Sequence, residues 1–199
     1  MVQTPPRSLT LEAFLKLPET KPASEFIGGQ ILQKPMPQGK HTTLQGDLVS
    51  AINTQLKGDR IARAYPELRC TFGGRSLVPD IAIFIWHQIP RDETGKVANV
   101  FATAPDWTIE ILSPDQSQTK VVRNILHWLS HGTQMGWLVD SEEELVFVYF
   151  ADSLADSLQE GVEQRAIAVF EQSEECLPVP AFAAAFQLTV GQLFSWLEA

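Results

Sequence analysis

The sequence predicts an α/β protein, in which strands buried on both faces alternate with amphipathic helices. Four short runs rich in Ile, Val and aromatic residues predict the buried strands, at 78–85, 106–112, 136–140 and 145–150. Leucines repeated every four residues after His41, and a two-faced pattern at 117–130, predict the helices. With 199 residues and 44% hydrophobic content, we expect one domain spanning residues 1–199.

The first elements are short and are marked by their boundary residues. Residues 10–17 predict a small amphipathic helix with Thr10 as its N-cap. Residues 24–32 predict a hairpin that turns at Gly28-Gly29. Glu25 lies just before the first apolar residue of this hairpin, where it is either a site residue or a solvated acid at the end of a strand.

His41 begins the first long helix, whose buried stripe is Leu44, Leu48, Ile52 and Leu56. It therefore lies in the first turn, near the positive end of the helix dipole. A histidine at such a place is either a surface residue or one that contacts phosphate or relays a proton.

The middle of the chain contains the central strands and a second helix. Residues 61–65 and 68–72 predict strands, and residues 73–75 predict a turn before the run at 78–85. In the helix at 117–130, one face is apolar and the other is Lys120, Asn124, His127 and His131. The two histidines have the i, i+4 spacing of zinc helices, but the glutamate of the HExxH motif is absent, which disfavours zinc.

The last third combines strands with acidic connections. Residues 136–140 and 145–150 predict a hairpin, 151–160 an acidic loop, and 166–170 a late strand. Residues 188–197 predict a short final helix with Thr189 as its N-cap.

Two acids set into apolar strands are the main candidates for chemistry. Asp80 begins one run and Glu110 lies within the next. If these strands are neighbours, the carboxylates face each other, and a divalent cation such as Mg²⁺ would relieve their repulsion. Alternatively, the two acids reach solvent or pair with a nearby Lys or Arg.

Charge and composition limit the remaining function classes. The net charge is −9, from 15 basic and 24 acidic residues, which is unusual for a nucleic-acid-binding protein. The acids are concentrated in the last third, so the sequence allows either a locally basic cleft on an acidic body or an acidic surface that serves solubility alone. No run is long enough to cross a membrane, residues 1–14 lack the apolar core of a signal peptide, and the two cysteines form no metal or redox motif. We therefore expect a reduced, cytoplasmic protein.

Taken together, several segments resemble the Uma2 family of restriction-endonuclease-like proteins, also called DUF820. They are Ser24-Glu25-Phe26-Ile27-Gly28-Gly29, His41, Val78-Pro79-Asp80-Ile81, Glu110-Ile111-Leu112-Ser113-Pro114 and Gly136-Trp137-Leu138-Val139-Asp140. The resemblance implies a PD-(D/E)XK nuclease fold, with a mixed central β-sheet flanked by helices. It also implies that Asp80 and Glu110 are metal ligands and that Glu25 and His41 line the same site.

The chain departs from this pattern at the lysine. The usual motif has a lysine two residues after the acid, where this sequence has Leu112. Related sequences carry it in the following helix, at the position of Asn124, with an aspartate at the position of Lys120. Lys120, one turn early, is the lysine that we expect to reach the site; the alternative is a solvated lysine, in a protein that binds metal without cleaving.

The resemblance predicts a metal-dependent endonuclease that hydrolyses phosphodiester bonds in nucleic acid, with DNA as the expected substrate. We expect Mg²⁺ as the cofactor, with Mn²⁺ as the alternative, and a homo-oligomer, preferably a dimer. The alternatives are a catalytically inactive binding protein with the same fold and an oligomeric scaffold with an interface of Trp128, Trp137, Phe194 and Trp196.

Overall fold

The structure, a computed structural model, describes residues 9–114, 116–151 and 167–198 and contains two β-sheets. The larger sheet has the strand order β10-β9-β8-β7-β6-β3. Its strands are β3 (Ala62–Pro66), β6 (Ile81–Ile85), β7 (Trp107–Leu112), β8 (Met135–Asp140), β9 (Leu145–Phe150) and β10 (Ile167–Phe170). Among the described strands of this sheet, only β7 and β8 pair in parallel, so the sheet is mixed, as predicted.

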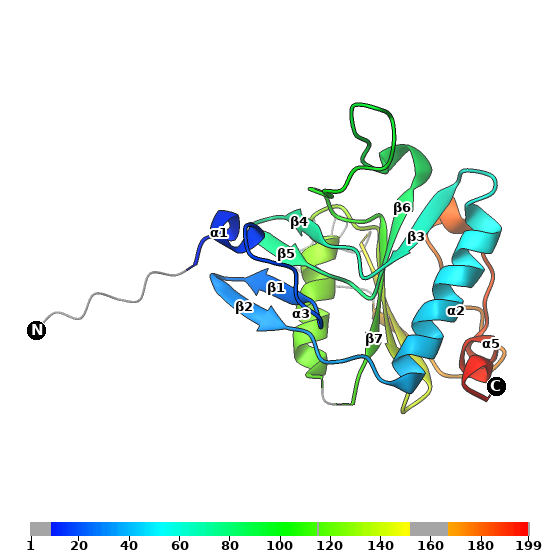
Figure 1. The fold of residues 1–199 in the computed structure, drawn as a ribbon. Coiled ribbons are helices and arrows are strands. Elements are labelled where there is room, and N and C mark those ends of the chain that lie inside the picture. The colour runs from blue at the N-terminus through cyan, green and yellow to red at the C-terminus, as the bar shows by residue number, and fades with distance from the viewer. Residues whose placement is uncertain (1–8, 115, 152–166, 199) are drawn as a thin grey trace, which may run out of the picture.

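The smaller sheet is antiparallel and lies beside the central one (Figure 1). Its order is β2-β1-β5-β4, with β1 (Ser24–Ile27), β2 (Gln30–Gln33), β4 (Cys70–Phe72) and β5 (Arg75–Leu77). Gly28 and Gly29 both have positive φ, which the tight turn between β1 and β2 requires, and the predicted hairpin is confirmed. The predicted turn at 73–75 was too long, because Arg75 already begins β5.

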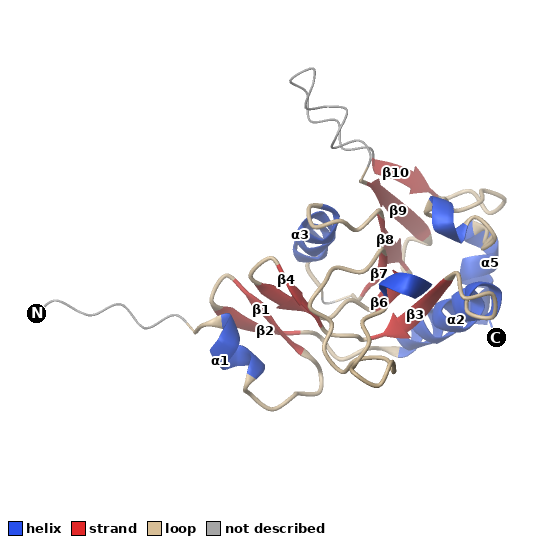
Figure 2. Ribbon diagram, turned by 90° about the horizontal axis from the view of Figure 1, so that it is seen from above, coloured by secondary structure: helices blue, strands red, loops and turns tan. Residues whose placement is uncertain are grey.

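Helices cover both faces of the central sheet. Helix α2 (Gly39–Leu56) lies on one face with α5 (Val190–Ser195), and its predicted stripe of four leucine and isoleucine residues is fully buried. Helix α3 (Gln118–Leu129) connects β7 to β8 and packs on the opposite face through Val121, Ile125 and Leu129. Seen from above, α3 and the small sheet lie on one side of the central sheet and α2 on the other (Figure 2).

The ends of these elements agree with the expected capping. Thr10 caps α1 (Leu11–Leu15) by accepting a hydrogen bond from the Ala13 amide. Thr189 and Gln192 form a capping box at the start of α5. The predicted acidic loop at 151–160 lies, except for Ala151, outside the described residues. No helix in the described part of the chain has the length and apolar character needed to cross a membrane.

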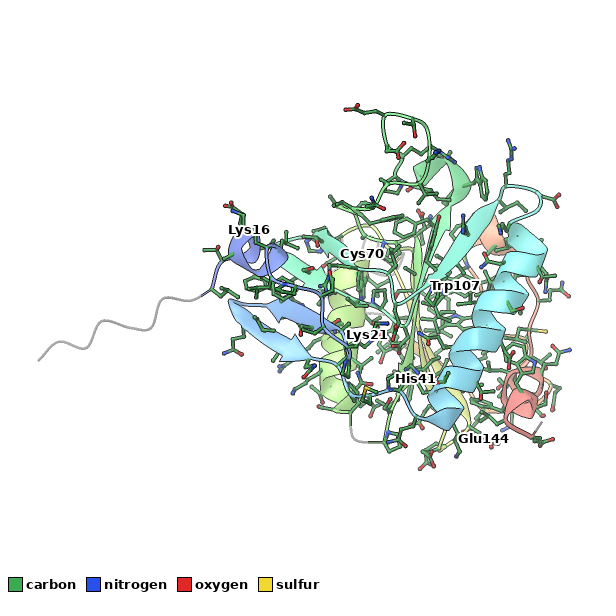
Figure 3. All side chains as sticks on the ribbon, in the orientation of Figure 1. Lys16, Lys21, His41, Cys70, Trp107 and Glu144 are labelled. Carbon is green, nitrogen blue, oxygen red and sulfur yellow. The ribbon has the colours of Figure 1, made fainter. Side chains whose placement is uncertain are left out.

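The four aromatic residues that could have formed an oligomer interface belong to the core or pack against it. Trp128 and Trp137 are fully buried, Phe194 is buried, and Trp196 packs against the same core. Trp107 lies between the sheet and α2 and contacts Trp137 edge to face (Figure 3). These residues therefore contribute to folding, and none of them forms an exposed apolar patch.

Strand alternation places the acids on the face opposite α2. Along β7, Trp107, Ile109 and Ile111 belong to the core beneath α2, so Glu110 points to the side of α3 and the small sheet.

Candidate active site

The two predicted acids are brought together by the pairing of β6 with β7. The strands are antiparallel, with Ile81 opposite Ile109, and extending this register by one residue places Asp80 opposite Glu110. Residues directly opposite each other in an antiparallel pair have Cβ atoms about 4.5–5.5 Å apart. Both side chains are buried, at 3% and 5% exposed. The expectation that the acids converge is therefore met by the geometry.

A lysine from outside the predicted site lies between them. The ammonium of Lys34, just after β2, is 2.6 Å from Asp80 Oδ1 and 3.7 Å from Glu110 Oε2. It also donates a hydrogen bond to the Val78 carbonyl at 2.8 Å. The pairing with a nearby lysine that the sequence allowed is therefore present, and the metal ion stays a prediction.

Asp80 is held on every side by further contacts. Its Oδ2 accepts a hydrogen bond from the Ile111 amide at 2.7 Å and lies 3.1 Å from His41 Nε2. Gln45, one turn further along α2, donates to the Asp80 carbonyl at 2.8 Å. His41 is buried, not a surface residue, at the N-terminal end of α2 (Figure 3). The start of α2 therefore fixes the position of this carboxylate.

Glu25 belongs to the same group of charges and is buried rather than solvated. Its Oε1 accepts a hydrogen bond from the Val78 amide at 2.9 Å, which joins β1 to the segment leading into β6. Asn124 of α3 lies near enough to this carboxylate to lower its pKa slightly against the larger effect of burial. The side chain at the usual family lysine position thus lines the same cleft as one of the predicted site acids.

Burial and the shared ammonium shift the pKa values of the three acids in different directions. Burial raises the pKa of Glu110 well above its usual range; the charge of Lys34 opposes this effect, and the charges of Asp80 and Glu25 add to it. For Asp80, burial is outweighed by the charge of Lys34 and the hydrogen bond from His41, so its pKa is lowered. Burial also raises the pKa of Glu25. One ammonium therefore serves three buried carboxyl groups, and it does not fully offset the effect of burial on Glu110 and Glu25.

Lys34 itself remains charged at neutral pH. Burial lowers the pKa of a lysine, but here the charges of Asp80, Glu110 and Glu25 outweigh this effect and raise it. Its side chain is only 13% exposed, so the ammonium has exchanged most of its hydration for these carboxylates and one carbonyl.

An open cleft of about 820 Å³ lies next to these charges. Its walls are the β1–β2 hairpin and α3, and Glu25 and Lys34 line it. Asp80 and Glu110 do not line it and are buried behind these two residues. Lys120 lines the α3 wall and is exposed, and within the described residues it forms no ion pair with either acid. In this structure the ammonium beside the two acids is that of Lys34, and the role of Lys120 stays a prediction.

The residues present suit a hard divalent cation in part. No three His, Cys, Asp or Glu side chains in the described segments form a ready-made metal site. However, Mg²⁺ commonly uses one or two carboxylates and completes its shell with water and substrate phosphate. Asp80 and Glu110 already share the Lys34 ammonium, and a divalent cation would favour the ionised form of Glu110 that burial disfavours.

The fold and the site together define a class of protein. A mixed central sheet flanked by helices, with two opposed acids and a lysine at a cleft, is the arrangement of a restriction-endonuclease-like protein. Residues 11–191 match the model of the Uma2 family, described as "Putative restriction endonuclease", and the chain belongs to this family.

A solved structure supports the same assignment. The chain is similar to a crystal structure described as that of "a putative nuclease belonging to DUF820" from Anabaena variabilis ATCC 29413. The two chains share 58% sequence identity with a TM-score of 0.87, and the match covers 95% of this chain and 99% of the other. The search among curated proteins gave no match.

Proposed function

We propose that this protein is a nuclease that hydrolyses phosphodiester bonds in nucleic acid, preferably DNA, with the help of Mg²⁺ or Mn²⁺. The description of its family and that of the Anabaena protein support nuclease activity. The observation that carries the proposal is the convergence of Glu25, Asp80 and Glu110 on one buried lysine beside an open cleft.

In this proposal Asp80 and Glu110 hold the metal ion. When bound, a divalent cation polarises a phosphoryl oxygen and lowers the pKa of a coordinated water. Asp80 is suited to this role because His41, Gln45 and the Ile111 amide fix its position. Preorganised ligands of this kind lose little freedom when they bind a cation.

Lys34 supplies the positive charge that the usual motif would place at Leu112. Its ammonium borders the cleft and the acids together, so it can stabilise negative charge that develops on a phosphate in the cleft. Glu25 also borders the cleft, and its raised pKa suits a group that exchanges a proton with water. Lys120, on the α3 wall of the cleft, is proposed as a further contact to the phosphate.

The proposal is tested by cleavage of labelled DNA and RNA with Mg²⁺, with Mn²⁺ and with EDTA. Asp80→Ala and Glu110→Ala should each abolish the metal-dependent activity, and Glu12→Ala, which changes an exposed acid of α1, should not. Circular dichroism confirms that each variant is folded. Metal-dependent cleavage that persists undiminished in both site variants would refute the assignment of these acids. Absence of cleavage by the wild type with either metal would favour the inactive binding protein.

A further inference from the structure

The cleft beside the candidate active site has a mixed lining with two distinct parts. One part is basic and consists of Lys34, Arg75, Lys120 and Arg123. The other is apolar and includes Ile27 and Leu32 from the hairpin and Leu126 from α3. Glu25 is the single carboxylate in the described lining. A chain with a net charge of −9 thus has a basic, partly apolar cleft at its proposed site.

Three of these basic groups have no acidic partner among the residues that the structure describes. Lys34 is engaged by Asp80, whereas Arg75, Lys120 and Arg123 form no ion pair there. Lys120 and Arg123 are exposed and Arg75 is half-buried. Unpaired cations on the wall of a cleft are available to bind an anionic ligand.

Arg75 lies beside the turn end of the β1–β2 hairpin and Lys34 beyond its other end, because Phe26 pairs with Ser76 and Ser24 with Gln33. Burial, together with the charge of Arg75, lowers the pKa of His127 to about 4, which places Arg75 near the last turn of α3. Lys120 lies in the first turn of the same helix. At 1.5 Å per residue, the wall from Lys120 to Ser130 extends roughly 15 Å, less than half of the 34 Å in one turn of duplex DNA.

We propose that this cleft binds a single strand of nucleic acid, with backbone phosphates on Arg75, Lys120 and Arg123 and unpaired bases against Ile27, Leu32 and Leu126. The inference rests on the proposed nuclease function and specifies its substrate. A duplex presents phosphates but keeps its base faces stacked inside, so it has nothing to place on the apolar part of the lining. A single strand exposes both, and proteins that bind it combine a basic groove with surfaces on which bases pack.

The test measures binding without metal, so that cleavage is not required. Fluorescence anisotropy in EDTA compares a labelled 12-nucleotide oligo(dT) with a labelled 12-base-pair duplex. The single strand should bind at least about tenfold more tightly, because its bases bury apolar surface of the cleft that a duplex leaves exposed. Arg75→Gln and Arg123→Gln should weaken this binding and should each reduce the slope of log K against log salt by about 0.7.

Two controls separate local from general effects. Lys57→Gln and Lys96→Gln make the same charge change at exposed positions outside the cleft, and they should leave the slope unchanged. Leu32→Ser, in contrast, should weaken binding of the single strand while preserving the slope, because it removes an apolar contact and no charge.

The outcomes distinguish this inference from the nuclease function. Equal or tighter binding of the duplex, or arginine variants that behave like the two lysine controls, would overturn the single-strand proposal even if the protein cleaves DNA. Undetectable binding of both ligands would also overturn it. Preferential, salt-dependent binding of the single strand that needs both arginines would support it even in a protein without measurable cleavage.

Discussion

The ammonium of Lys34 is the charge on which the site depends, and its removal gives the sharpest prediction. In Lys34→Met the side chain keeps a similar length and apolar body but loses its charge. Asp80 and Glu110 then remain buried, at 3% and 5% exposed, without the cation that both contact. The charge of Lys34 also opposes the raised pKa of Glu25, so a third carboxyl group is affected.

The expected magnitude follows from burial. Breaking a buried ion pair by removing one partner costs about 3–5 kcal/mol, because the remaining charge is left in a medium that solvates it poorly. Lys40→Met is the matched control, since Lys40 pairs with Glu142 at 3.1 Å but both side chains are about half exposed. An exposed pair of this kind contributes roughly 0–1 kcal/mol.

Urea unfolding at pH 7 measures the free energy of unfolding of the wild type and both variants, first in EDTA and then in excess Mg²⁺. Lys34→Met should lose several times more free energy of unfolding than Lys40→Met, and Mg²⁺ should stabilise Lys34→Met more than the wild type, because the cation would replace the missing charge. If the two variants lose the same free energy, Lys34 is not a buried counterion. If Mg²⁺ does not stabilise Lys34→Met, the proposal of a metal at these acids is wrong.

Three further predictions concern packing and pH. Gly136→Ala should destabilise the protein by about 1–3 kcal/mol in urea unfolding, because its Cβ would lie 2.6 Å from Ile125 Cγ2 on α3; a neutral effect would refute this packing. Gly46→Ala, in an open position of α2, should instead stabilise by about 1 kcal/mol, and destabilisation would show that the helix is constrained there. The pKa of His127 is about 4 against an ordinary 6.5, so the unfolded chain takes up a proton first and the wild type should lose stability as the pH falls through this range. His127→Gln should lose less over the same range than the exposed control His87→Gln, and identical pH profiles would refute the shift.

The helices and strands could be predicted largely because their signals are local. The repeat from Leu44 to Leu56 indicates α2 without knowledge of its neighbours, and Gly28-Gly29 indicates the β1–β2 turn. The smaller sheet could not be predicted as a unit, because β5 has only three residues and pairs with β1 through Phe26 and Ser76. Three residues are too few for an alternating pattern to distinguish a strand from a turn.

The candidate site likewise has a part that the sequence predicts and a part that it does not. The convergence of Asp80 and Glu110 could be predicted because consecutive strands commonly pair, which made the acids neighbours. Lys34 was missed because it lies in a proline-rich connection, 46 residues from Asp80, and no periodicity marks it. The available signal was the charge itself: acids inside apolar strands require a cation, and a lysine at the end of the hairpin was as good a candidate as one on α3.

Because β6 and β7 pair directly, the spacing of the two acids does not depend on the length of the segment that connects these strands. The backbone hydrogen bonds between the two strands align the acids, whereas residues 86–106 form a connection that lies outside the sheet. The tip of this connection is exposed, and an antiparallel β-bridge between Arg91 and Val97 closes it. Doubling the length of a loop costs only about 0.6 kcal/mol in closure entropy. Residues can therefore be inserted at this tip, as a tag or a recognition module, without changing the spacing of the two carboxylates.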